Sequence, residues 1–395
     1  MNIDYTVSAH GAELQSLRFD GREYLWQGDP AYWGRRAPIL FPIVGKVAGD
    51  VLRVDGQSYP MKQHGFARDV EFVPDAELAD VSGRPVPGHA EAVPELVDAV
   101  SELADAVSGL AEVVPGLADA VPELVEGPTD CRFVMAGDGT RENYPFKYGF
   151  SVRYHVDGKR LYCTWTVENR DERDLHFQIG AHPAFNLPDF DPSDPVHGYI
   201  ECHDADGRLV DPVLRHYLVD GLRVPFEEPC RMLRQAQHPE DRSLSPLTLP
   251  EGRSLSPSTP LEGRSLSPSK GRSDSRSLSP STPSERSLSL LKGRLALAND
   301  TFAADAFLIE GAQVASATLI DKAGRPVLTV GCPQAQAFGL WAPSKPGCPF
   351  VCLEPWCGIT DPAGFAGDIS ERELDHRLAP GERYEFTYWI EVAGN

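Results

Sequence analysis

Two segments of the chain place one ionisable side chain beside a proline at the end of an apolar run. His182 follows such a run and precedes Pro183, which fixes its own φ and restricts the preceding residue to extended backbone. Glu354 ends a second apolar run and is followed by Pro355. An imidazole and a carboxylate held on constrained backbone suit proton transfer. The alternative for each is structural: a core histidine bonded to a carbonyl, or a buried, paired carboxylate.

Further polar candidates lie in the first 70 residues of the chain. Arg35 and Arg36 stand at the head of a segment whose two prolines exclude both a helix and a central strand, so the segment is predicted to be extended. His64 and Arg68 belong to the sequence QHGFARD. Their structural alternative is a surface turn with a solvated charge.

The elements that position these residues are predicted to be short strands. Turn residues recur at regular intervals, and there is no amphipathic stretch of helical length in the first 73 residues. An antiparallel meander of three strands is expected before His182, and no Gly-rich phosphate loop occurs. The predicted fold class is all-β, with strands over 150–156, 161–168, 175–180, 306–310, 316–321, 327–330, 337–341 and 384–392.

Two segments of biased composition interrupt this pattern. Residues 75–129 contain an acidic seven-residue repeat with prolines that would break a coiled coil, which indicates a flexible or partly helical insertion in a hairpin. Residues 235–294 repeat RSLSP and are predicted to be disordered, because Ser, Pro and Arg bury too little apolar surface. The rival interpretation of the second segment is a phosphorylated tract that binds a partner. Both segments are expected to be dispensable for folding.

Charge and cysteine content restrict the partners. A net charge of −21 argues against nucleic acid and against an anionic membrane surface. The amino terminus has no signal-peptide pattern and no stretch is long and apolar enough for a membrane helix, so a cytoplasmic location is expected. The 8 cysteines include no Cys-x-x-Cys pair, which favours reduced, buried thiols over a zinc site.

Four separated motifs, RAPILFPIVGK, QHGFARD, GAHPAFN and LEPWCGITD, closely resemble the aldose 1-epimerase (galactose mutarotase-like) family, in particular its LacX-like branch. The resemblance covers the chain except for roughly 75–129 and 235–294. It implies one domain over 1–395 that these two insertions interrupt. The implied fold is an antiparallel β-supersandwich with a sugar cleft on one sheet.

The resemblance also implies roles for individual residues. His182 corresponds to the general acid and Glu354 to the general base that interconvert α and β anomers by opening the sugar ring. His64 corresponds to a second histidine that hydrogen-bonds the sugar, and Arg36 and Asp305 to substrate-binding residues, with Asp300 as the alternative to Asp305. Arg68 is a further substrate-binding candidate. No metal and no cofactor are expected, and the expected partner is a small-molecule sugar.

Two other functions remain open on the sequence. The first is a hexose-6-phosphate mutarotase, in which Arg35, Arg36 and Arg68 would bind phosphate. The second is a catalytically silent sugar-binding module on the same fold. Catalysis would place His182 and Glu354 roughly 5–8 Å apart across one cleft, with Glu354 ionised and His182 able to donate a proton.

Overall fold

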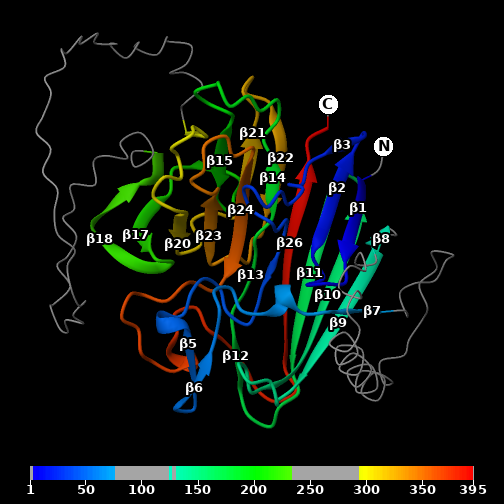
Figure 1. Ribbon diagram of the computed structural model, residues 1–395, viewed down its shortest axis with the longest axis vertical. Coiled ribbons are helices and arrows are strands. Elements are labelled where there is room, and N and C mark those ends of the chain that lie inside the picture. Colours follow the sequence, from blue (N-terminus) through cyan, green and yellow to red (C-terminus); the bar gives the residue numbers. More distant parts are fainter. Residues whose placement is uncertain (1–2, 76–123, 127–129, 234–292, 395) are drawn as a thin grey trace, which may run out of the picture.

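The computed structural model describes residues 3–75, 130–233 and 293–394, together with the backbone of 124–126 (Figure 1). Most of the two predicted insertions lies outside these residues. The described part of the chain contains 26 strands and three short 3-10 helices, Ala48–Asp50, Ala67–Asp69 and Ile369–Glu371. The all-β prediction is therefore confirmed. No helix among the described residues is long and apolar enough to cross a membrane.

The largest sheet has ten strands and contains the longest strands of the molecule (Figure 1). Two of its long strands, Arg160–Asn169 and Arg383–Val392, alternate buried with partly exposed side chains, as expected where one face of a sheet lies on the core. Its order is β16 (Leu209–Val210), β15 (Tyr199–His203), β21 (Ser316–Ile320), β22 (Pro326–Gly331), β26 (Arg383–Val392), β11 (Arg160–Asn169), β10 (Lys147–Asp157), β9 (Asp130–Asp138) and β7 (Val73–Pro74), and β19 (Leu295–Ala296) pairs with β15.

A second sheet of six strands lies at the centre of the view in Figure 1. Its strand β24 is buried at every position, so both of its faces are covered. The order is β20 (Phe307–Glu310), β23 (Ala337–Trp341), β24 (Phe350–Cys357), β13 (Ile179–Ala181) and β4 (Ile39–Leu40), and β14 (Ala184–Asn186) also pairs with β24. The proline-flanked segment predicted to be extended is thus an edge strand, β4.

Smaller sheets complete the architecture. One has four strands, in the order β3 (Arg22–Glu23), β2 (Leu14–Phe19), β1 (Ile3–Ser8) and β8 (Leu124–Glu126). Three are two-stranded: β5 (Val51–Val54) with β6 (Gln57–Pro60), β12 (Leu175–Phe177) with β25 (His376–Leu378), and β17 (Val213–Val219) with β18 (Leu222–Arg231).

The predicted meander is correct for its first two strands and wrong for the third. β10 and β11 form a hairpin around Gly158, with Asp157 paired to Arg160. The other neighbour of β11 is the C-terminal strand β26, whereas the third predicted strand divides into β12 and β13, which belong to other sheets. Proximity in sequence favoured the meander, but the long β26 pairs with β11 over nine residues, from Arg160 to Glu168.

The strands that flank the first insertion pair with each other. Val73 and Pro74 of β7 pair antiparallel with β9, as expected for a hairpin with an inserted segment. The predicted insertion also includes β8, which pairs with β1. A deletion intended to keep the four-stranded sheet should therefore retain Leu124–Glu126.

An aromatic core joins the six-stranded sheet to the ten-stranded sheet. Phe41, which follows β4, stacks on Phe150 of β10 at 4.7 Å between ring centroids and lies 5.9 Å from Phe177. All three rings are at least 98% buried. Burial of large apolar side chains at about 25 cal/mol per Å² is the main stabilising contribution here, and it holds the end of β4 and β12, which contains Phe177, against the large sheet.

A histidine–aspartate pair next to the β12–β25 sheet gives a pH prediction for stability. His176 Nδ1 lies 2.6 Å from Asp375 Oδ2, and this hydrogen bond raises the pKa of His176. The pair of protonated His176 with Asp375 therefore stabilises the folded protein. This contribution is fully present below the pKa of an unfolded histidine, about 6.5, and is lost as pH rises through the higher pKa of the folded state. His176→Gln should therefore lower the free energy of unfolding more at about pH 5.5 than at about pH 8. Denaturant titrations that show the same difference at both pH values would contradict this prediction.

Candidate active site

The strand pairing places His182 opposite Glu354. β24 pairs antiparallel with β13 at Gly180 and with β14 at Ala184, in the same register on both sides. His182 is the residue midway between the two pairs, so its cross-strand neighbour is Glu354. Cross-strand neighbours point to the same face of a sheet with Cβ atoms about 5 Å apart. His182 Nε2 accordingly lies 3.2 Å from Glu354 Oε2.

Both groups are removed from solvent. The side chain of His182 is 9% exposed and that of Glu354 is 2% exposed. His182 Nδ1 has no hydrogen-bond partner among the described residues, and Glu354 Oε2 has none there apart from its contact with His182 Nε2. They lie closer together than the expected 5–8 Å, because adjacent strands hold them directly opposite each other. A sugar that reached both would have to separate them.

The electrostatics of the pair differ from the expected charged form. Burial, with the positive charges of Arg68 and Arg35 as the main further causes, lowers the pKa of His182 to about 3. Burial first, and the charge of Asp305 second, raise the pKa of Glu354 well above its usual range. Each shift follows from the cost of charge in a low-dielectric site. The pair therefore favours an uncharged form in which Glu354 carries the proton.

His64 lies beside His182, with ring centroids 5.5 Å apart in an edge-to-face arrangement. The backbone of His64 is left-handed, at φ 66°, and its N–H donates to the carbonyl of Gly45. The amide of Gly45 donates in return to His64 Nδ1 at 3.1 Å. Since Nδ1 accepts, a neutral ring carries its proton on Nε2, which lies 3.3 Å from the side-chain amide of Gln63. Burial and the charges of His182, Arg68 and Arg35 lower the pKa of His64, which favours this neutral form.

Arg35 and Arg68 lie close enough to His64 and His182 to lower the pKa values of both histidines. Arg35 forms an ion pair with Asp69 at 2.6 Å. Arg68 donates through Nη2 to the carbonyl of Gln63, and its buried Nε has no hydrogen-bond partner among the described residues. Burial lowers the pKa of Arg68 to about 10, yet it remains a cation at neutral pH.

Arg36 and Asp305, which were predicted to bind substrate, do not bond directly to His182 or Glu354. Arg36 Nη1 donates to the carbonyl of Gln15 at 2.8 Å, so its guanidinium is bound to β2. Of these two adjacent arginines, Arg35 is the one whose charge lowers the pKa of His182, as the charge of Arg68 also does. Asp305 is exposed, and its charge acts on Glu354. The structure thus brings together His182, Glu354, His64 and Arg68, with Asp305 nearby, whereas Arg36 bonds to β2.

Aromatic side chains that the sequence analysis missed surround His182. Trp33 stacks on the His182 ring at 4.9 Å between centroids, and Trp341 of β23 meets it edge-on at 5.6 Å. Trp33 also stacks on Phe350 at 6.0 Å. Both tryptophans are half-buried. The only signal in the sequence was the position of Trp33 two residues before Arg35.

The end of the LEPWCGITD motif is structural. Thr360 Oγ1 donates to the carbonyl of Gly221 and accepts from the amide of Lys46. Asp361 accepts from Arg372 Nε at 2.7 Å, and the two side chains are 4% and 2% exposed. The bond from Lys46 ties the residues that follow β24 to the segment that precedes His64, and the other bonds tie them to Gly221 and Arg372.

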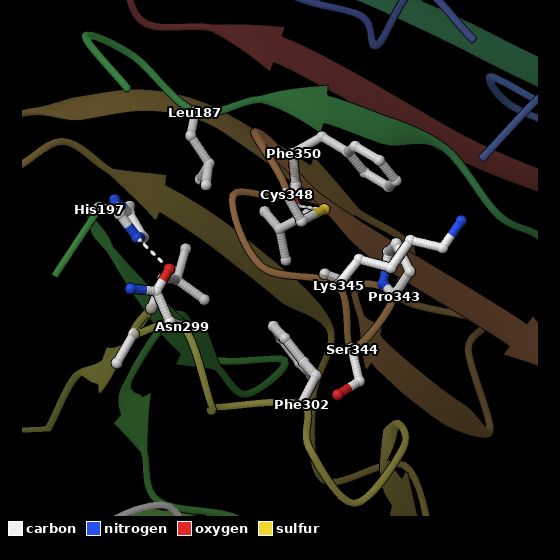
Figure 2. A pocket seen from close by; sticks show the side chains of 13 residues that line it. Leu187, His197, Asn299, Phe302, Pro343, Ser344, Lys345, Cys348 and Phe350 are labelled. Atoms are coloured by element: carbon white, nitrogen blue, oxygen red, sulfur yellow. Dashed lines mark hydrogen bonds between the residues drawn. The ribbon is translucent and has the colours of Figure 1, made fainter. Parts of the chain in front are cut away.

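A small pocket lies near the start of β24 (Figure 2). Its lining combines apolar side chains, such as Phe302 and Phe350, with polar ones, and Figure 2 shows a hydrogen bond between His197 and Asn299 at one side. None of the predicted site residues lines it. Phe350 lines the pocket and also stacks on Trp33, so the pocket adjoins the aromatic surroundings of His182.

The sequence model of the family described as "Aldose 1-epimerase" matches residues 2–80 and 123–201, which include His64 and His182. The chain is 29% identical over 185 residues to the plasmid and chromosomal forms of protein LacX from Lactococcus lactis subsp. lactis. These matches cover 45% of this chain and 46% of LacX, so they span about half the length of that protein.

Solved structures share the fold over nearly the whole chain. A galactose mutarotase related enzyme from Lactobacillus acidophilus superposes with a TM-score of 0.65 and 22% identity, covering 100% of this chain and 95% of that one. A galactose mutarotase-like protein from Lactobacillus casei ATCC 334 gives 0.64 and 21%, covering 99% and 97%. The predicted β-supersandwich of the galactose mutarotase type is therefore confirmed.

Proposed function

The chain belongs to the aldose 1-epimerase family, as a LacX-like member, and on this premise we propose that it is a mutarotase that interconverts the α and β anomers of a free aldohexose. The observation that carries the proposal is the buried contact of 3.2 Å between His182 Nε2 and Glu354 Oε2, with His64 beside it. An acid and a base on one face are what ring opening requires.

The reaction needs one proton removed and one delivered. Glu354 takes the proton from the anomeric O1 while His182 donates a proton to the ring oxygen, and the ring opens. The carbonyl carbon then rotates by half a turn, and the same two transfers in reverse close the ring on its other face. His64, with its proton on Nε2, donates a hydrogen bond to a sugar oxygen.

For Glu354 to act as the base and His182 as the acid, the uncharged pair must first become a carboxylate and an imidazolium. Its single proton passes from Glu354 to His182 along their contact of 3.2 Å. Sugar hydroxyls that hydrogen-bond to both groups would favour the charged form, because they supply the polar partners that burial has removed. Substrate binding thus prepares the acid and the base together.

The test is to follow anomer equilibration by polarimetry or by NMR exchange, with purified protein and a panel of free and phosphorylated hexoses. Catalysed equilibration of a free hexose supports the proposal. Sugar binding without acceleration of any substrate would contradict it and would favour the silent sugar-binding module.

A second candidate is a hexose-6-phosphate mutarotase. It is favoured by the charges of Arg35 and Arg68, which lower the pKa values of both site histidines. It is also favoured by the Nε of Arg68, which has no hydrogen-bond partner in the part of the chain that the structure describes. Guanidinium groups bind phosphate through several N–H donors. If this candidate is correct, the phosphorylated members of the panel should react faster, and Arg68→Gln should reduce the rate on phosphorylated hexoses more than the rate on free hexoses.

Trp33 should act as a stacking surface for the sugar. Its ring is half-buried and lies against His182, where the apolar face of a pyranose could pack on it. Trp33→Ala should raise KM by a few-fold to about tenfold, corresponding to about 0.5–1.5 kcal/mol, with a smaller effect on kcat. Trp33→Phe is the matched control and should retain most of the affinity. An unchanged KM in Trp33→Ala would contradict this role.

A further inference from the structure

A third chemical group faces the catalytic pair. Cys352 lies two residues before Glu354 on β24, so both side chains point to the same face of the sheet. The potential metal-ligand atoms of His182, Cys352 and Glu354 all lie within 4.8 Å of one another. Within the described residues, this is the one group of three or more such side chains close enough to share a metal ion.

The three donors match one class of metal. An imidazole nitrogen, a thiolate and a carboxylate form a mixed set of borderline-soft ligands that suits Zn²⁺ rather than Mg²⁺ or Ca²⁺. Bond lengths of about 2.0–2.3 Å in a tetrahedral site place donor atoms about 3.3–3.8 Å apart. The His182–Glu354 contact of 3.2 Å is already near that spacing. The thiol would need to move by about 1 Å at most.

The state of the donors is a second, independent observation. His182 and Glu354 are 93% and 99% buried by residue. Glu354 Oε2, the carboxylate oxygen of the 3.2 Å contact, is a buried polar atom without a hydrogen-bond partner among the described residues. Cys352 is fully buried and free, in no disulfide. Burial of polar groups without partners is costly, and a cation bound to the carboxylate would relieve part of that cost.

We propose that His182, Cys352 and Glu354 form an inhibitory Zn²⁺ site inside the active site. Binding transfers the thiol proton and the Glu354 proton to solvent, and His182 supplies a neutral nitrogen. The two negative ligands balance the ion, so the buried site has no net charge. A water or a sugar hydroxyl takes the fourth position. The inhibition rests on the proposed mutarotase function, because the ion occupies its acid and base, whereas the binding does not.

Binding is tested on sugar-free protein. Zn²⁺ affinity is measured by competition with a chromophoric chelator, and Co²⁺ replaces Zn²⁺ to report a thiolate-to-metal charge-transfer band. The wild type should show one strong site with that band. Cys352→Ser should lower the affinity more than about 100-fold, since loss of an outer-shell partner alone costs 10–100-fold. His182→Asn should weaken binding similarly and gives the same information if Cys352→Ser does not fold.

Cys348→Ser is the matched control. Its thiol lies on the same segment and donates to the carbonyl of Phe350, so its loss should leave the Co²⁺ band and the Zn²⁺ affinity unchanged. Wild-type affinity in Cys352→Ser, or a Co²⁺ spectrum without a thiolate band, would overturn the proposal. Where the wild type catalyses mutarotation, Zn²⁺ should abolish the rate at one equivalent and a chelator should restore it. Activity that persists in the zinc-loaded protein would overturn the inhibitory role. Zinc binding by a protein that is inactive on every sugar would support the metal site and refute the mutarotase function.

Discussion

His182→Asn and Glu354→Gln should each reduce kcat for mutarotation by about 10²–10⁴-fold, which is the contribution expected from one general acid or base. Gln matches Glu in size, and Asn keeps a hydrogen-bonding group in place of the imidazole, but neither amide can transfer a proton near neutral pH. Sugar affinity should therefore change much less than kcat. Polarimetry gives the rate, and isothermal titration gives the affinity for the same sugar.

His197→Asn is a suitable control for this prediction, because His197 is also a buried histidine but bonds to Asn299 at the edge of the separate pocket. It should retain the wild-type kcat. Wild-type rates in His182→Asn or Glu354→Gln would refute the catalytic assignment and favour the silent sugar-binding module. A combined variant should be hardly slower than the worse single variant, because residues that act as one unit are not additive.

Asp361→Asn should destabilise the protein by about 3–5 kcal/mol, the usual cost of removing one partner from a buried ion pair. Arg372 would be left as an uncompensated charge, with a side chain that is 2% exposed. Its Nε would face a neutral amide oxygen in place of the carboxylate oxygen that accepts at 2.7 Å. Burial already lowers the pKa of Arg372, which shows that its charge is disfavoured at this position. Denaturant unfolding of wild type and variant measures the loss.

The double variant Asp361→Leu with Arg372→Met distinguishes an unpaired charge from a loss of packing. Replacing both partners by apolar side chains of similar size should recover much of the stability, because no buried charge remains. Asp206→Asn breaks an exposed ion pair with Arg208 and should have little effect. A loss of less than 1 kcal/mol in Asp361→Asn would show that the buried pair does not hold the end of β24.

The sequence by itself determined much of the architecture and the identity of the catalytic candidates. Alternating apolar residues and turn dipeptides predicted most of the strands, because periodicity and turn chemistry are local properties. The proline after His182 and the proline after Glu354 marked both residues as held on extended backbone. These signals require no knowledge of distant parts of the chain.

Only the tertiary structure decided which distant groups meet. The register of β24 against β13 and β14 sets the contact of 3.2 Å between His182 and Glu354, and register depends on the packing of whole sheets. The same packing directs Arg35 toward the histidines and binds Arg36 to Gln15, although the two are adjacent in sequence. Trp33 and Cys352 join the site for the same reason: contacts between residues far apart in the chain follow from strand pairing and burial, which no local pattern encodes.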